Sequence, residues 1–180
     1  MNKAIFLDRD GTIIRDTHHP HKPEDVHLIP GATAALGRAR EAGYLLFLFT
    51  NQSGVGRGIF KLEDVHICNA HMLELLGLGD DLFTDICIAP EHPDEPSQYR
   101  KPSPRFIQEM IDKHELDPAR CSMVGDRISD WGAGVNAGIT PIALKTGKDF
   151  SEASLAYIDE HKVAVYDALL DYVDALLTGN

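Results

Sequence analysis

A short apolar run that ends in two closely spaced carboxylates constrains the fold of this chain most. Residues 4–7 are apolar and bounded by charge, which is typical of a buried strand in a parallel sheet. Asp8 and Asp10 follow directly, and Gly11 allows the backbone to turn sharply just after them. Because ligands bind at the carboxyl ends of strands in open α/β sheets, a site is expected here.

Asp8 and Asp10 have the chemistry that phosphoryl transfer requires. Two carboxylates this close repel each other unless a cation or a proton lies between them. One carboxylate can attack phosphorus, the other can carry a proton, and together they offer oxygen ligands to a hard cation. The alternative is a turn with solvated acids, because Asp-Gly is also common in turns.

Further apolar stretches alternate with helix-like segments along the chain. We expect strands at residues 44–49, 83–89, 121–124, 139–144 and 161–166. We expect helices at residues 32–42, 62–76, 103–114 and 167–177, and another that begins at Ser129 or Asp130. This alternation predicts an α/β fold with a central, mostly parallel sheet. No repeat or linker divides the chain, so residues 1–180 are expected to form a single domain.

Charge and cysteine content exclude several classes of function. A net charge of −11 argues against binding to nucleic acid or to an anionic membrane, because both require basic surface. No apolar stretch approaches the roughly 18 residues of a membrane span, and no signal peptide is expected. Cys68, Cys87 and Cys121 lie in apolar stretches, which favours buried reduced thiols over disulfides. We therefore expect a cytoplasmic protein.

Two later segments carry groups that can bind an anion. Thr50 and Asn51 begin a glycine-rich stretch that reaches Arg57. Such a loop can cradle a phosphate, although plain turns share its composition. Arg100 and Lys101 precede an expected helix. Two cations at that position can clamp an anion, and the alternative is a pair of solvated surface charges.

A second pair of acids, Asp126 and Asp130, follows the expected strand at residues 121–124. The carboxyl ends of parallel strands lie at the same edge of a sheet, so these acids should meet Asp8 and Asp10 there. The anion-binding segments should reach the same edge. Their common position is what turns separate weak signals into one predicted site.

Residues 13–30 are rich in histidine and proline and should form a loop or a short hairpin beside this edge. Three histidines, His18, His19 and His21, fall within residues 17–22. We favour solvated histidines over metal ligands, because there is no cysteine and no helical spacing. A flap over the substrate fits better, since loops at this end of a sheet carry specificity.

The order of these segments, from Ile5 to about Gly147, resembles the haloacid dehalogenase (HAD) superfamily of phosphohydrolases. The motifs that carry the likeness are Asp8-Arg9-Asp10-Gly11-Thr12, Thr50-Asn51-Gln52-Ser53-Gly54 with Arg57-Gly58, and Arg100-Lys101-Pro102. Together they look like the subgroup of small histidinol-phosphate phosphatases and D-glycero-D-manno-heptose 1,7-bisphosphate 7-phosphatases. The resemblance implies a Rossmann-like three-layer sandwich.

The resemblance also implies catalytic and metal-binding roles. Asp8 would be the nucleophile, and Asp10 would be the general acid and then the general base. Mg²⁺ would be held by Asp8, the backbone carbonyl of Asp10 and Asp126, with Asp130 in support.

The remaining motif residues would bind the substrate. Thr50, Asn51 and Lys101 would hold the phosphoryl oxygens, where charge must be stabilised during transfer. Arg57 and Arg100 are candidates for binding the rest of the substrate.

One loop departs from the subgroup pattern. Members typically carry Cys-x-His and later Cys-x-Cys there, whereas this chain has Ala89-Pro90-Glu91-His92-Pro93 and then Ser97-Gln98-Tyr99. One histidine without thiolates is insufficient for structural zinc, so no zinc is expected. No insertion large enough for a cap domain follows the first or second motif, which predicts an open edge.

The expected function is a Mg²⁺-dependent phosphomonoesterase with an aspartyl-phosphate intermediate, acting on a sugar phosphate such as D-glycero-D-manno-heptose 1,7-bisphosphate. Histidinol phosphate is the alternative substrate. A polynucleotide 3′-phosphatase fits the negative charge less well, and a non-catalytic phosphate-binding domain is disfavoured because Asp8 and Asp10 are both present. The expected partner is a small phosphorylated substrate. A monomer is expected, with an oligomer left open.

Overall fold

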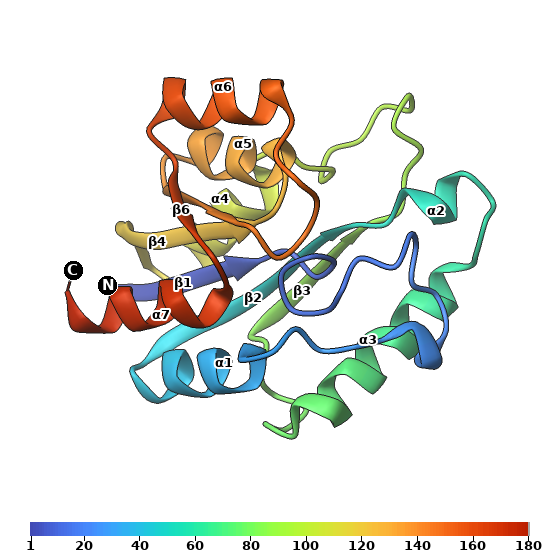
Figure 1. The fold of residues 1–180 in the computed structure, drawn as a ribbon, viewed down its shortest axis with the longest axis horizontal. Coiled ribbons are helices and arrows are strands. Elements are labelled where there is room, and N and C mark those ends of the chain that lie inside the picture. The colour runs from blue at the N-terminus through green and yellow to red at the C-terminus, as the bar shows by residue number, and fades with distance from the viewer. Residues whose placement is uncertain (180) are drawn as a thin grey trace.

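A six-stranded parallel sheet runs through the part of the chain that the computed structural model describes, residues 1–179 (Figure 1). The strands are β1 (Asn2–Leu7), β2 (Tyr44–Asn51), β3 (Asp85–Ala89), β4 (Leu116–Gly125), β5 (Thr140–Leu144) and β6 (Ala164–Tyr166). They lie in the order β3-β2-β1-β4-β5-β6, and every adjacent pair is parallel. The predicted α/β fold with a parallel sheet is therefore confirmed.

Helices cover both faces of the sheet and complete three layers (Figure 1). The helices are η1 (Pro23–Asp25), α1 (Ala32–Glu41), α2 (Ser53–Gly56), α3 (Leu62–Leu76), α4 (Arg105–Lys113), α5 (Ile128–Ala137), α6 (Glu152–His161) and α7 (Leu169–Thr178). One face packs against α1, α3 and α7, and the other packs against α4 and α5. Within residues 1–179 no segment forms a large cap domain over the sheet.

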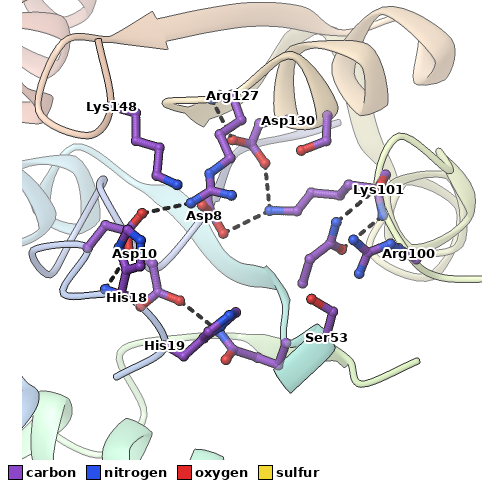
Figure 2. A pocket seen from close by; sticks show the side chains of 14 residues that line it. Asp8, Asp10, His18, His19, Ser53, Arg100, Lys101, Arg127, Asp130 and Lys148 are labelled. Atoms are coloured by element: carbon purple, nitrogen blue, oxygen red, sulfur yellow. Dashed lines mark hydrogen bonds and ion pairs between the residues drawn. The ribbon is translucent and has the colours of Figure 1, made fainter. Parts of the chain in front are cut away.

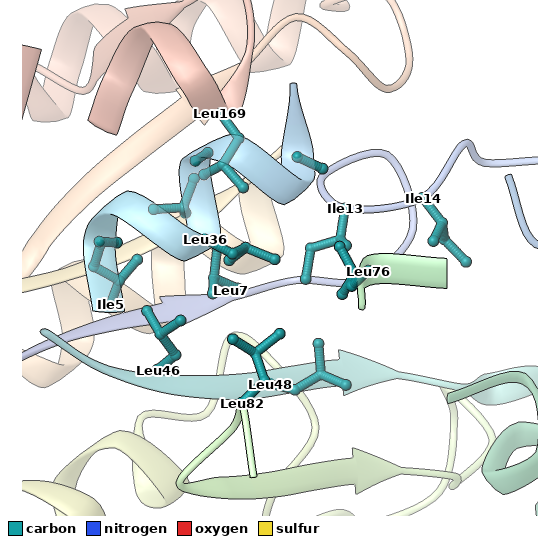
Figure 3. Close-up of a cluster of buried hydrophobic side chains, with 14 of the residues drawn as sticks. Ile5, Leu7, Ile13, Ile14, Leu36, Leu46, Leu48, Leu76, Leu82 and Leu169 are labelled. Carbon is teal, nitrogen blue, oxygen red and sulfur yellow. The ribbon is translucent and has the colours of Figure 1, made fainter. Parts of the chain in front are cut away.

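The alternating faces of β1 explain why its sequence is continuously apolar. Ile5 and Leu7 belong to the larger hydrophobic cluster, on the side of α1, α3 and α7 (Figure 3). Ala4 and Phe6 belong to the second cluster, where Phe6 stacks on Phe47 of β2 with ring centroids 4.7 Å apart. Successive strand residues point to opposite faces, so a strand covered on both sides must be apolar throughout.

Besides the later starts of β3, at Asp85, and of β6, at Ala164, four other differences from the sequence-based predictions bear on the fold. Helix α6 was not predicted, because none of its residues is buried and so no apolar stripe marks it. Strand β4 begins at Leu116 rather than at residue 121, through a mostly exposed segment. Helix α4 begins at Arg105, with Pro104 as its N-cap residue, so Ser103 was the wrong cap.

The fourth difference lies at the start of α5, where Arg127 is the N-cap residue rather than Ser129 or Asp130. Asp130 instead accepts a 3.0 Å hydrogen bond from the backbone N–H of Arg127 through Oδ2.

All three cysteines carry free thiols, although Cys87 is only half-buried. No helix within residues 1–179 is both long enough and apolar enough to cross a membrane.

Candidate active site

A polar cavity of about 220 Å³ opens at the carboxyl end of the sheet (Figure 2). It lies where β1 and β2 end and where the segments around residues 100 and 127 approach them. The residues that line it are Asp8, Asp10, Asp16, His18, His19, Asn51, Gln52, Ser53, Arg100, Lys101, Arg127, Ser129, Asp130 and Lys148. The predicted convergence of distant segments at one edge is thus observed.

Lys101 lies between two acids at the centre of this cavity (Figure 2). Its ammonium Nζ is 2.8 Å from Asp8 Oδ1 and 2.7 Å from Asp130 Oδ1, and it also donates to the carbonyl of Phe49 at 2.6 Å. Burial alone would lower the pKa of Lys101, but Asp130 and Asp8 outweigh burial and raise it. The site therefore contains a fixed, buried cation beside Asp8.

Asn51 holds the backbone of Lys101 in place. Its side-chain nitrogen donates to the carbonyl of Lys101 at 3.1 Å, and its side-chain oxygen accepts from the Lys101 N–H at 3.0 Å. The peptide bond that follows, Lys101–Pro102, is cis. A paired amide at the end of β2 thus fixes the position of a cation supplied by another segment.

Three buried carboxylates, Asp8, Asp126 and Asp130, form a cluster in which one oxygen from each lies within 4.8 Å of the others. Asp126 Oδ1 is buried without a hydrogen-bond partner among residues 1–179. Burial, reinforced by the charges of Asp8 and Asp130, raises the pKa of Asp126 to about 7. Burial likewise raises the pKa of Asp130 to about 6, although Lys101 opposes the shift.

This donor set fits a hard divalent cation. Magnesium prefers carboxylate and carbonyl oxygens, and a cation among Asp8, Asp126 and Asp130 would relieve their mutual repulsion. The unpaired oxygen of Asp126 is the kind of buried group that requires such a partner.

Two glycines make the space that Asp126 occupies. A Cβ at Gly11, where φ is +84°, would lie 2.7 Å from Asp126 Oδ2. A Cβ at Gly147 would lie 1.9 Å from the same oxygen. Any larger residue would therefore displace the carboxylate. Glycine at both positions is therefore required for Asp126 Oδ2 to occupy its observed place.

Asp10 is held by side chains on both sides. The Arg9 guanidinium donates to Asp10 Oδ1 at 3.0 Å and to Oδ2 at 3.2 Å, and Gln52 donates to Oδ2 at 2.8 Å. Burial raises the pKa of Asp10 and outweighs the opposing effect of Arg9. Its carboxylate is therefore fixed in direction at the edge of the cavity.

Two of the predicted substrate-binding residues, Thr50 and Arg57, lie outside the cavity lining. Thr50 is fully buried, does not line the cavity, and its hydroxyl oxygen accepts from Gln52 at 2.8 Å. Arg57 is exposed beyond the end of α2 and outside the cavity lining. Arg100 does line the cavity, and its Nη1 is buried without a hydrogen-bond partner in the described part of the chain.

The structure adds residues that the sequence did not single out. Lys148 lines the cavity, and its backbone N–H donates to Asp126 Oδ2 at 3.3 Å. Arg127 also lines it and pairs with Asp16 at 2.7 Å. Lys148 follows the end of β5, so its position at this edge of the sheet could have been predicted from the strand pattern alone. His18 and His19 bring the histidine-rich loop to the cavity, as the predicted flap requires.

Comparisons with known proteins agree with this geometry. Residues 98–172 match the HAD-hydrolase-like family. The chain is 34% identical over 187 residues to D-glycero-D-manno-heptose-1,7-bisphosphate 7-phosphatase from Chlorobaculum tepidum, covering 95% of this chain and 94% of that protein. It is 38% identical over 161 residues to the D-glycero-beta-D-manno-heptose-1,7-bisphosphate 7-phosphatase from Pasteurella multocida, covering 84% and 86%.

A solved structure has the same fold. The D,D-heptose 1,7-bisphosphate phosphatase from B. bronchiseptica, complexed with magnesium and phosphate, superimposes with a TM-score of 0.86. It is 27% identical, and the match covers 99% of each chain.

The sheet order and the acid cluster around a buried lysine define a hydrolase of the HAD superfamily. Within that superfamily, the chain belongs to the phosphatase family that contains the heptose-1,7-bisphosphate 7-phosphatases. The family and the class of enzyme, a phosphoric monoester hydrolase, were both predicted from the sequence, and both predictions are confirmed.

Proposed function

We propose that the protein is a Mg²⁺-dependent phosphatase that hydrolyses a heptose 1,7-bisphosphate through an aspartyl-phosphate on Asp8. The observation that carries this proposal is the placement of Lys101 Nζ between Asp8 and Asp130, two members of the carboxylate cluster that Asp126 completes. A nucleophilic carboxylate and a fixed cation thus line the cavity, and Asp8 and Asp130 join them to the buried Asp126 as a metal-ligand set.

In the first step, Asp8 attacks phosphorus and the bond between phosphorus and the sugar oxygen breaks. Asp10 gives its proton to that oxygen, so the sugar leaves as an alcohol. Lys101 stabilises charge on the phosphoryl oxygens, together with Asn51. Thr50 is proposed to contribute to substrate binding indirectly, by holding the side chain of Gln52. The Thr50 hydroxyl oxygen accepts a hydrogen bond from the Gln52 amide.

In the second step, Asp10 takes a proton from a water molecule whose oxygen attacks phosphorus. The bond between Asp8 and phosphorus then breaks and releases inorganic phosphate, which restores both carboxyl groups to their starting protonation states. Asp8, Asp126 and the carbonyl of Asp10 would hold the magnesium ion, with Asp130 in support. When bound, this ion neutralises negative charge on the transferred group.

The substrate proposal rests on the relatives that are named for heptose 1,7-bisphosphate and on the cations at the cavity mouth. Arg100 is proposed to bind the part of the substrate beyond the reacting phosphate, and Arg57 is proposed to contribute from outside the cavity. The open edge leaves room for a sugar bisphosphate. No zinc is proposed, because the loop at residues 90–99 contains no cysteine.

We further propose that residues 1–180 act as one HAD-like hydrolase domain, since all six described strands share one sheet. We propose a cytoplasmic location from its three free cysteines, and no binding to nucleic acid or membrane from its charge of −11. A monomer is proposed, with an oligomer left open.

The test compares phosphate release by the wild-type protein and by Asp8→Asn, with and without Mg²⁺. The substrates are both anomers of heptose bisphosphate, histidinol phosphate and a 3′-phosphorylated oligonucleotide. We expect the highest kcat/KM for one heptose bisphosphate anomer, dependence on Mg²⁺, and no turnover by Asp8→Asn. Equal release by the two proteins would exclude the covalent mechanism, and a higher kcat/KM for histidinol phosphate would replace the proposed substrate.

A further inference from the structure

A buried hydrogen-bond network extends from Asp10 to helix α3, away from the cavity. Arg9 is 0% exposed, and besides Asp10 its guanidinium has two other partners. Its Nη1 donates to Asn69 Oδ1 at 3.0 Å, and its Nη2 donates to the carbonyl of Pro20 at 3.4 Å. The network thus joins the end of β1, the histidine-rich loop and the middle of α3.

Asn69 is the fixed end of this network. It is 5% exposed, lies among the buried residues of α3 and does not line the active-site cavity. A buried polar side chain on the core face of a helix costs free energy unless it is paired. Its oxygen is paired with Arg9, whereas its nitrogen has no partner within residues 1–179. The contact with Arg9 is therefore the interaction, in this described part of the chain, that accounts for an asparagine at this position.

The direction of Asp10 depends on the guanidinium plane of Arg9. Because a guanidinium is planar and its donors form a rigid fork, a hydrogen bond at one nitrogen restrains the direction of the other nitrogens. Nε and Nη2 face the two oxygens of Asp10, and Nη1 faces Asn69. The hydrogen bond from Nη1 to Asn69 therefore controls the direction in which Nε and Nη2 donate to Asp10.

We infer that Asn69 is a positioning residue that aims the Asp10 carboxyl group at the leaving oxygen of the substrate by fixing the plane of Arg9. This inference rests on the proposed role of Asp10 as the general acid. Asn69 itself touches neither the cavity nor Asp10. Its removal should therefore impair proton transfer to the leaving group and leave phosphate binding unchanged.

The readout is how strongly the rate depends on the leaving group. An alcohol such as a sugar needs a proton as it leaves, whereas p-nitrophenolate leaves readily without one. The value of kcat/KM reports only the steps up to departure of the leaving group, so the later use of Asp10 as a base does not enter. The quantity to measure is the ratio of kcat/KM for heptose bisphosphate to kcat/KM for p-nitrophenyl phosphate.

We expect Asn69→Leu to lower this ratio by about tenfold or more, part of the contribution that a general acid typically makes. Asn69→Asp keeps an acceptor for Arg9 Nη1 and should keep the ratio close to that of the wild type. If Asn69→Leu does not fold, Asn69→Ala removes the same acceptor and is expected to lower the ratio in the same way. Met72→Ala is the matched control, because Met72 is buried on the same helix without a part in the network. It should lower the melting temperature and leave the ratio unchanged.

The inference is overturned if the Asn69→Leu or Asn69→Ala variant reacts with both substrates at wild-type rates, or loses activity on both by the same factor. Asp10→Asn separates this outcome from a failure of the proposed function. If Asp10→Asn lowers the ratio and the Asn69 variants do not, only the positioning role is wrong. If Asp10→Asn also leaves the ratio unchanged, the proposed acid role of Asp10 fails, and the inference fails with it.

Discussion

Lys101 and Asp8, 93 residues apart in the sequence, share a buried hydrogen bond of 2.8 Å. The side chain of Lys101 is 1% exposed and that of Asp8 is 9% exposed. The ammonium also faces Asp130, so one cation offsets two carboxylates. A buried charge without its partner is strongly destabilising, so the stability of the fold and the chemistry of the site depend on the same atoms.

The first prediction concerns removal of this cation. Lys101→Met should lower the free energy of unfolding by about 3–5 kcal/mol, because Asp8 and Asp130 are left buried and uncompensated. Adding Asp130→Asn should restore part of the loss, and urea titrations of the two single variants and the double variant measure the coupling. Lys162→Met is the control, because its pair with Asp159 is exposed and should contribute little. Additive effects of Lys101→Met and Asp130→Asn would contradict the prediction.

The second prediction concerns pH and magnesium. The pKa of Asp126 is about 7 in the folded protein and about 3.9 in an unfolded chain. Between these values the folded state binds more protons, so without metal the free energy of unfolding should fall as pH rises from about 4 to about 7. The proposed binding of Mg²⁺ to the ionised cluster should restore stability at pH 7 and above.

Urea unfolding at several pH values, with and without Mg²⁺, measures both effects on stability. Asp126→Asn should reduce the pH slope and the response to Mg²⁺ together. A variant that keeps the full slope would show that another group is responsible.

The third prediction concerns Gly147. Gly147→Ala places a Cβ 1.9 Å from Asp126 Oδ2 and must displace that carboxylate. Changes beside a metal ligand typically weaken metal binding by about 10–100-fold, so the Mg²⁺ concentration for half-maximal activity should rise at least tenfold. Gly37→Ala lies on α1, where the new Cβ meets only Leu78 at 3.6 Å, and should leave the Mg²⁺ requirement unchanged. An unchanged requirement in Gly147→Ala would mean that Asp126 does not bind the metal.

The fourth prediction distinguishes the two arginines that were proposed to bind substrate. Arg100 lines the cavity with one buried, unpaired nitrogen, whereas Arg57 is exposed outside it. Arg100→Ala should raise KM for heptose bisphosphate by about tenfold, since a charged hydrogen bond contributes about 1.5–3 kcal/mol. Arg57→Ala should change KM by no more than about threefold, because exposed charges are screened. Steady-state kinetics check both values, and a larger effect at Arg57 would reverse the assignment.

The sequence predicted the sheet well because the apolar runs of its central strands, β1, β2 and β4, are buried on both faces. Runs such as residues 4–7 are apolar throughout, and each ends in polar residues at the same edge. Asp8, Lys101 and Asp126 could be predicted as neighbours, because the segments that carry them all reach that edge of the sheet. Helix α6 was not predicted because its side chains are at most half-buried, so its sequence shows no hydrophobic periodicity.

The hydrogen-bond partners in the site could not be predicted in the same way. Arg9 lies between two acids in the sequence and reads as a solvated charge, yet it is fully buried. Asn69 reads as a polar position on an amphipathic helix, and only the fold brings it to Arg9. The Thr50 hydroxyl was expected to face the phosphate, but Gln52 donates to it instead. Such contacts depend on distances that hydrophobic patterning does not encode.

The central position of β1 has a consequence for biosynthesis. This strand is made first, and β2 can pair with one of its edges soon afterwards. Its other edge needs β4, which ends at Gly125. Until that segment leaves the ribosome, the nascent chain carries an open strand edge and an incomplete core, which is the condition that favours aggregation. Asp126 follows immediately and Asp130 four residues later, so completion of the carboxylate cluster and closure of this edge of β1 depend on the same short stretch of chain.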